Sequence, residues 1–226
     1  MNVRQLFFAF LALVSGCTDF PDIGRSSEPY ITRKLDPKDS VAVRAILDAN
    51  SLHDSDWTDV AYISVFSEND RMITVSLDSK GLDTIHVPDG ISFGSGKVMI
   101  SASYNSLRTW QMELTKISHL IDVELSGNVM DSGVLNIGSG IAAVSAVNCT
   151  RCGIRKVNFT NSSLAALREM NLNGNEMIDF PEFAFSNAAL KVSVRGNSIC
   201  SPSPALDAFL QRYDRDWRKN QVCTSP

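Results

Sequence analysis

Apolar and polar positions follow one spacing in six stretches of the chain. In each stretch two apolar residues stand two positions apart, a polar slot follows three residues later, and another apolar residue comes soon after. In the clearest copy, residues 167–177, Met170 and Leu172 are the apolar pair and Asn175 fills the polar slot. Alternation over so few residues predicts a short strand with one buried face. Such a strand cannot bury its apolar face alone, so the pattern requires stacked neighbours.

The copies recur at a nearly constant interval. The first apolar position falls at residues 75, 100, 123, 144, 170 and 192, so the steps are 25, 23, 21, 26 and 22 residues. Intervals in this range, combined with this pattern, resemble leucine-rich repeats. The polar slot is filled in order by Lys80, Asn105, Asn128, Cys149, Asn175 and Asn197. We expect the asparagine amides to bond backbone groups that each turn leaves unpaired.

These observations predict an α/β fold, a leucine-rich-repeat solenoid of about six repeats over residues 72–199. The strands should be short and parallel, and the returns mostly irregular or 3₁₀. Later apolar residues of each repeat, such as Ile178 and Phe180, are expected to close the core on the opposite side. One short helix is expected near residues 163–168.

Both ends of the array carry sequences that suit end caps, which a solenoid needs over its open core. Residues 37–71 predict a helix beginning near Asp39 or Ser40, then a hairpin turning at residues 68–70. Residues 200–226 predict a second cap with a helix over residues 204–212. The apolar residues expected to face the repeats are Val41, Ile46, Leu47 and Ala49 in the first cap and Leu206, Phe209 and Leu210 in the second, with Trp217 packed behind them.

The stretch VAVRAILDANSL, the phased repeats, and the closing GNSIC and LDAFLQRYDRDWRKNQVC together resemble secreted bacterial leucine-rich-repeat proteins. The resemblance covers residues 36–223, although Lys80, Ala102 and Cys149 are weak matches to the repeat. It implies a solenoid that presents its strand face as a binding surface, usually to a protein.

The N-terminus has the layout of an export signal. Residues 1–16 contain one cation, Arg4, then an apolar run too short to cross a membrane, then small residues. Val14-Ser15-Gly16-Cys17 resembles the bacterial lipobox, which implies that Cys17 carries the lipid. Residues 17–36 would then form a flexible tether, and Thr18 after the cysteine favours the outer membrane by the same resemblance. The alternative is an ordinary cleavable signal and a secreted protein.

Four further cysteines are an even number, which favours disulfides in an exported chain. Three connectivities are possible, and we expect Cys200–Cys223 and, as the second bridge, Cys149–Cys152. A redox role for the CxxC spacing would need a thioredoxin-like βαβ context, which is not evident. A zinc site would need more ligands, and the three histidines are scattered singly.

The outward positions of the strands are the candidate binding face. They are mostly small and polar, with acidic residues in the middle and basic residues toward the C-terminal end. The alternative is a solvated face with no partner, because polar residues are expected outside any core. The candidates are Met99, Ser101, Tyr104, Asp122, Glu124, Glu169, Asn171, Asn173, Lys191 and Arg195.

Composition and motifs favour a non-enzymatic protein. The net charge of −4 argues against nucleic acid as a partner, and no hydrolase motif or cofactor site is evident. The stretch SFGSGKV is similar to a phosphate loop but lacks the required residues at its ends, where Ile91 and Val98 stand. Glycosylation sequons begin at Asn148, Asn158 and Asn161, and they would matter only in a eukaryotic secreted protein. A purely structural envelope protein remains the other alternative.

Overall fold

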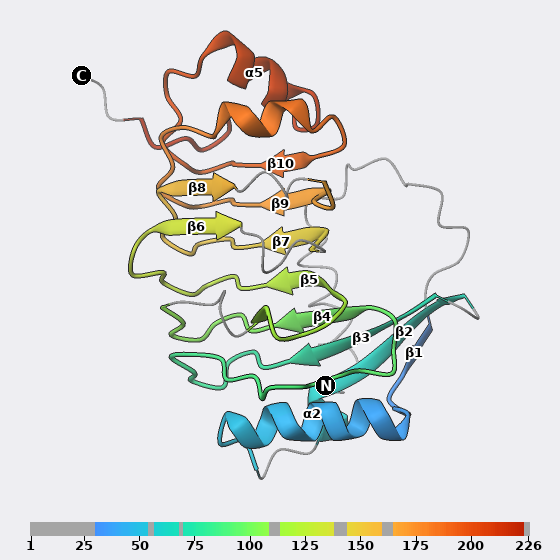
Figure 1. The fold of residues 1–226 in the computed structure, drawn as a ribbon. Helices are drawn as coiled ribbons and strands as arrows, with labels where there is room; N and C mark the ends of the chain where they lie inside the picture. Colours follow the sequence, from blue (N-terminus) through green and yellow to red (C-terminus); the bar gives the residue numbers. More distant parts are fainter. Residues whose placement is uncertain are drawn as a thin grey trace, which may run out of the picture.

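The computed structural model describes residues 30–53, 57–67, 70–108, 114–137, 144–159 and 165–223. The expected signal peptide, the lipid site at Cys17 and the tether up to residue 29 lie outside these residues. The described chain is a parallel β-solenoid in which short strands stack between a helix at each end (Figure 1). The predicted solenoid of short parallel strands with two capped ends is therefore confirmed.

One eight-stranded sheet forms the strand face of the solenoid. Its first three strands pair antiparallel, so the predicted hairpin pairing is confirmed, although residues 68–69 of the turn lie outside the described residues. All later neighbours pair in parallel. Within the described residues, six parallel strands are joined by about five turns. In sheet order the strands are β1 (Tyr30–Thr32), β2 (Ala61–Ser67), β3 (Asp70–Ser76), β4 (Val98–Ser101), β5 (Leu120–Glu124), β7 (Ala146–Asn148), β9 (Glu169–Asn171) and β10 (Lys191–Ser193).

The fourth repeat lies three residues later than the sequence pattern suggested. Val147, not Val144, pairs with Val123 of β5 and with the equivalent methionine of β9. This register places Cys152, rather than Cys149, in the polar slot. It is the better register because it turns the Arg151 side chain to solvent, whereas the predicted register turned it toward the core. The strand positions then step by 25, 23, 24, 23 and 22 residues.

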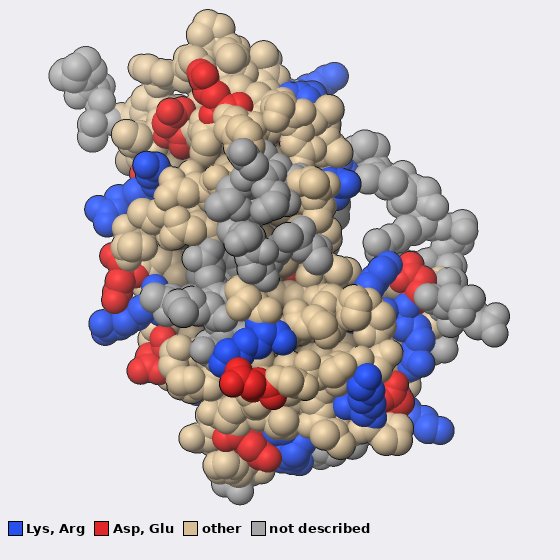
Figure 2. Space-filling model, in the orientation of Figure 1, with Lys and Arg blue, Asp and Glu red and all other residues tan. Residues whose placement is uncertain are grey.

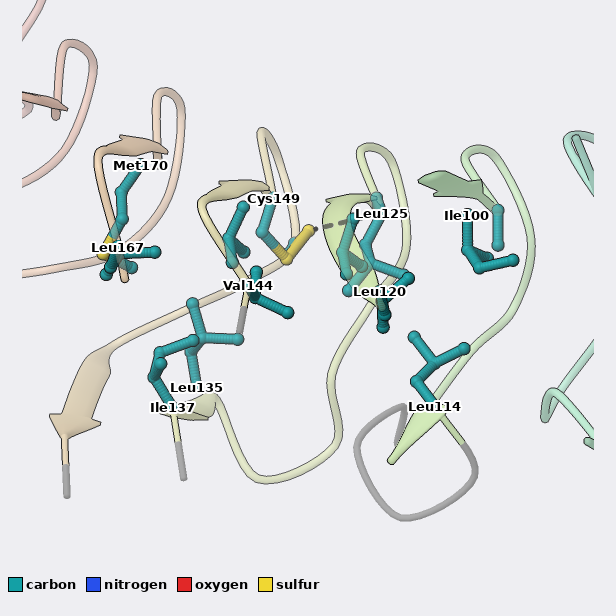
Figure 3. Close-up of a cluster of buried hydrophobic side chains, with 14 of the residues drawn as sticks. Ile100, Leu114, Leu120, Leu125, Leu135, Ile137, Val144, Cys149, Leu167 and Met170 are labelled. Atoms are coloured by element: carbon teal, nitrogen blue, oxygen red, sulfur yellow. Dashed lines mark hydrogen bonds between the residues drawn. A yellow bond between two sulfur atoms is a disulfide. The ribbon is translucent and has the colours of Figure 1, made fainter. Parts of the chain in front are cut away.

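A second, two-stranded sheet on the return side was not predicted. It pairs β6 (Val134–Ile137) with β8 (Lys156–Phe159), and both run opposite to the main strands (Figure 1). Leu135 and Ile137 of β6 are buried and lie near Val144 in the same apolar cluster (Figure 3). The core is therefore closed by a short sheet here, instead of by irregular chain alone.

The other returns are short, as expected, and one is the 3₁₀ helix η2 (Glu182–Ser186). The predicted helix near residues 163–168 is not formed in its described part, residues 165–168, which is a turn and irregular chain. Phe180 is buried as predicted, but Ile178 is 74% exposed, so its expected role in the core is wrong. Ile178 and Asp179 are both exposed, and the chain returns to the core only at Phe180.

Asparagines in the polar slot form a buried ladder along the solenoid. The Nδ2 of Asn128 donates to the carbonyl of Leu125 at 2.7 Å and to that of Ala102, in the preceding repeat, at 2.9 Å. Its Oδ1 accepts the N–H of Leu107. Each such set of bonds is one rung, and it joins two repeats. Comparable rungs are made by Asn105, Asn175 and Asn197. The predicted role of the asparagines is confirmed.

The rung of the fourth repeat is covalent. A disulfide joins Cys152 to Cys149, so a bond between sulfurs spans the same three residues that an asparagine spans elsewhere. The Cys152 Sγ lies 3.3 Å from the Leu125 carbonyl oxygen, where an asparagine Nδ2 would donate (Figure 3). In the other rungs an asparagine Oδ1 accepts a backbone N–H of the preceding repeat. Here the corresponding N–H, that of Met130, donates to the Cys152 backbone carbonyl. Both cysteines are fully buried.

The N-terminal cap helix α2 (Pro37–Ala49) begins two residues earlier than predicted, because Asp36 caps it and accepts the N–H of Asp39. Ile46 and Leu47 are buried as expected, but Val41 is exposed because the buried side of the helix includes Val43 instead. Ala49 is only partly covered. The four-residue helix α3 (Trp57–Val60) follows.

A buried carboxylate attaches this cap to the first return. Asp39 is fully buried and accepts the N–H groups of Gly94 and Ser95, together with the Ser95 hydroxyl. The loop that is similar in sequence to a phosphate loop therefore wraps a side-chain carboxylate of its own chain. Its backbone N–H groups bind an anion, as such loops do, but the anion is part of the fold.

The C-terminal cap matches the prediction. Helix α5 (Pro204–Gln211) begins at Ser203, whose side chain accepts the N–H of Leu206. Gln221, beyond the helix, makes the last rung of the ladder. Its Oε1 accepts the Ile199 N–H, and its Nε2 donates to the Val194 carbonyl. The predicted disulfide Cys200–Cys223 holds this segment in place. The three apolar residues expected to cover the last repeat, Leu206, Phe209 and Leu210, are buried, and so is Trp217.

Candidate binding surface on the strand face

Alternate residues of each strand turn away from the core, and parallel pairing aligns them in columns. Glu124 of β5 stands in register with Ser101 of β4 and Asn148 of β7. Asn148 in turn stands beside Asn171 of β9, and Ser193 of β10 follows. Neighbouring strands lie about 4.8 Å apart, so the columns offer polar groups at short, regular intervals. The surface predicted from the sequence is thus one continuous face.

A second hydrogen-bonded ladder runs along this face at its N-terminal side. Asp78 accepts the Ser101 hydroxyl at 2.7 Å and the Ser103 N–H at 2.6 Å. The Ser103 hydroxyl donates to Glu124, which also accepts the N–H of Ser126. The carboxylates and hydroxyls of three consecutive repeats are therefore linked side to side. These groups are held in fixed positions before any partner arrives.

Glu124 has a perturbed acidity. Its half-buried position raises the pKa of the carboxyl above the ordinary 4.5, because desolvation disfavours the charged form. Hydrogen bonds from Ser126 and Ser103 oppose this effect, and the negative charge of Asp78 adds to it. The centre of the face therefore holds an acidic group that gains a proton more readily than a solvated glutamate.

The C-terminal side of the face ends in an ion pair. Asn173 accepts the Ser193 hydroxyl and the N–H of Arg195. The Arg195 guanidinium bonds both oxygens of Asp214, which belongs to the cap, at 2.8 Å and 2.6 Å. A bidentate pair with a nearly buried carboxylate fixes the arginine strongly. The guanidinium of Arg195, a predicted binding residue, is therefore already paired with the C-terminal cap.

A second column of outward residues, which contains Met99, Asp122, Glu169 and Lys191, is more open to a partner. Glu169 is exposed, whereas Met99 and Lys191 are half-buried. Lys191 stands in register with Glu169. Asp122 accepts the Ser145 hydroxyl at 2.9 Å. This column therefore combines both charges with one apolar side chain near the centre of the face.

Tyr104 is the largest exposed side chain beside the face. Its backbone has φ 56°, and its side chain is 57% exposed. The ring lies over Gly127 of the next repeat: a Cβ at that glycine would stand 2.7 Å from the tyrosine Cδ1. The glycine therefore makes room for the ring. Among the predicted candidates, Tyr104 and Glu169 are the two most accessible to a partner.

Sequence reasoning missed the contribution of the fourth repeat. The predicted register, with residue 144 as the first apolar position, turned Val147 outward, but Val147 is buried in the core. The outward residues are Ala146, Asn148 and Thr150; the Asn148 side chain accepts the hydroxyls of Ser126 and Thr150. The spacing of residues 144, 147, 149, 152 and 154, all apolar or cysteine, was the signal that could have found this register.

The described residues contain no group of three or more His, Cys, Asp or Glu side chains that could hold a metal ion. In the same part of the chain, no helix is both long enough and apolar enough to span a bilayer. The two disulfides indicate an oxidising compartment outside the cytoplasm. No known protein family matches the sequence, and no curated protein matches it either.

Proposed function

We propose that the protein is a non-enzymatic leucine-rich-repeat module, held at the cell envelope by a lipid on Cys17, that binds a protein through its strand face. The observation that carries the proposal is the unbroken outward face of six parallel strands, with a sealed cap at each end. The spacing of the repeats and the asparagine ladder support the leucine-rich-repeat type. The proposed ligand is a protein or another surface component of the envelope.

The layout of the face suits binding better than chemistry. Its hydroxyls, amides and carboxylates are already ordered by the ladder, which lowers the entropy that a partner must remove on association. Glu169 and Tyr104 stand out from this ordered surface. A partner would therefore meet two accessible side chains on a flat polar background.

A site-specific photo-crosslinking experiment tests the proposal. A benzophenone amino acid replaces Glu169 on the strand face of the full chain, expressed in cells that make the native envelope. The matched control places the same group at Asn136, an exposed position of β6 on the return side. We expect one discrete crosslinked band from position 169 and none of that size from position 136.

The mature N-terminus, read by mass spectrometry from the same cells, tests the anchor separately. We expect acyl chains on Cys17 and loss of membrane association in Cys17→Ser. If both crosslinking positions give the same bands, or position 169 gives none, the strand face is not the binding surface.

One observation favours a second candidate, a purely structural envelope protein. Most polar groups of the strand face already have partners within the chain, as Arg195 and Glu124 show. A face whose hydrogen bonds are satisfied can remain solvated with no ligand. The crosslinking experiment separates the two candidates, because a purely structural face gives no discrete band at position 169.

A further inference from the structure

The turns that follow β7 and β9 carry opposite charge without pairing with each other. The segment after β7, which we name the basic turn, exposes Arg151 and Arg155, together with Lys156 at the start of β8. The turn after β9, the acidic turn, exposes Glu176 and Asp179. Adjacent turns touch, as the bond from the Glu176 N–H to the Ile154 carbonyl shows. Across the described part of the chain, none of these five side chains forms an ion pair.

Two large apolar side chains lie exposed beside these charges. Ile178, in the acidic turn, is 74% exposed, and Val129, in the turn before the basic one, is 69% exposed. Exposed apolar residues are ordinary when scattered singly. Here they lie on the same surface as unpaired charges of both signs, and that combination is typical of the centre and rim of a protein interface.

The arginines of the basic turn are already held in place. A Cβ at Gly133 would stand 2.5 Å from the Arg155 Nε, and one at Gly174 would stand 3.1 Å from the Arg151 Cγ. Each arginine side chain therefore lies flat over a glycine of a neighbouring turn. Arg155 also donates to the Ser132 carbonyl. Side chains fixed in this way lose little freedom when a partner binds.

We infer that this surface is an interface between two copies of the chain. The basic and acidic turns are adjacent, so a two-fold axis between them places the basic turn of each copy against the acidic turn of the other. Ile178 stands in the acidic turn beside Asp179, so the same contact would cover it. Charges of both signs follow one another along this edge of the molecule, at the left in Figure 2. The two solenoids would lie antiparallel, as an isologous dimer requires.

The charge layout is the reason for choosing a second copy over an unrelated protein. A foreign partner would need its own acidic and basic groups at the matching spacing, whereas a second copy supplies them by symmetry. The contact also gives the charges of both turns a partner of opposite sign, which they do not have within the described part of one chain. The inference does not depend on binding at the strand face, because its residues lie in the turns that follow the strands.

Sedimentation of the purified full chain, in one detergent, over a dilution series tests the inference. We expect a monomer–dimer equilibrium for the unaltered chain. Arg155→Glu and Glu176→Arg should each weaken it at least about tenfold, because each places like charges opposite one another. Ile178→Lys should weaken it as well, whereas Val41→Lys, at an equally exposed position of α2, should not.

A charge exchange separates the interface from any effect on folding. The chain carrying both Arg155→Glu and Glu176→Arg should recover the dimer, because each copy again meets the opposite charge. A mixture of the two single variants should form a heterodimer for the same reason. A monomer at every concentration overturns the inference. So does a dimer that Arg155→Glu leaves unchanged, or a double variant that stays monomeric.

Discussion

Two hydrogen-bonded ladders run along the solenoid, and they do different work. The inner ladder is made of asparagines such as Asn128, which is fully buried and bonds backbone groups of two repeats. The outer ladder, on the strand face, links side chains such as Ser126 and Asn148 that are only half-buried. A buried polar group cannot turn to water when its partner is lost, whereas an exposed one can. The inner ladder therefore holds the fold, and the outer one arranges a surface.

The largest expected effect is the removal of an inner rung. Asn128→Ala leaves the Leu125 carbonyl and the Leu107 N–H without their partner in a buried place, whereas the Ala102 carbonyl keeps the bond that the Asn105 amide donates. We expect a loss of about 3 to 5 kcal/mol in the free energy of unfolding, from the two unsatisfied groups. Urea unfolding followed by circular dichroism measures it. A loss below about 1 kcal/mol would show that water replaces the amide, and the distinction between the ladders would fail.

The covalent rung is the next test. Replacing Cys149→Leu and Cys152→Asn together converts the fourth repeat to the type of its neighbours, which have Leu125 and Asn128 at these positions. We expect a folded protein within about 2 kcal/mol of the original, because the asparagine bonds offset the loss of a bridge that closes only a short loop.

The control is Cys149→Leu with Cys152→Ala, which removes the bridge and supplies no amide. Thermal unfolding without reductant compares the two variants. The alanine control should unfold at the lower temperature. If the two variants unfold at the same temperature, an asparagine at position 152 adds no stability, and the comparison of the disulfide with an asparagine rung is wrong.

A change in the outer ladder should cost less. Ser103→Ala removes the hydroxyl that donates to Glu124 but leaves the N–H of residue 103 bonded to Asp78. We expect a loss of about 1 kcal/mol, the usual value for one hydrogen bond. The same urea experiment measures it beside Asn128→Ala. A loss as large as that of the inner rung would contradict the ranking.

Glu124→Gln should change how the free energy of unfolding depends on pH more than it changes the free energy at any one pH. The folded chain raises the pKa of Glu124 above 4.5, so the folded state binds the proton more tightly than the unfolded state does. The unaltered protein should therefore gain stability as the pH falls from above the raised pKa toward 4.5, and the contribution of Glu124 is lost above that window. The glutamine variant should lack this increment. Unfolding midpoints measured across the window decide it, and parallel curves for the two proteins would rule out the effect.

The sequence was a good guide wherever a repeat follows the average pattern. It located both caps, the asparagine rungs and the disulfides, because apolar period, helix starts and cysteine number are local signals. It failed at the fourth repeat, where Val144 and Val147 are both apolar and two cysteines could fill one slot. Only the pairing of Val147 with the neighbouring strands decides between the two registers.

The surface was harder to predict than the fold. Sequence alternation shows which residues point outward, but not which of them are already bonded across repeats. Arg195 illustrates this, because its partner Asp214 lies in the cap, 19 residues away. Ile178 shows the opposite error, since an apolar residue was assigned to the core although the turn exposes it. Both outcomes depend on contacts between repeats, which a single stretch of sequence does not contain.

Gln221 has a consequence for how such a protein can change in length. The last repeat receives its rung from a cap residue that is not part of any repeat. The array therefore stops because Gln221 of the cap takes the place of one more asparagine, and Asp214 of the cap also pairs with Arg195 of the last repeat. A unit of about 23 residues could be inserted or deleted between the caps while each end keeps the same partners. Length is thus a free variable of this architecture, and the size of the strand face can evolve in whole units.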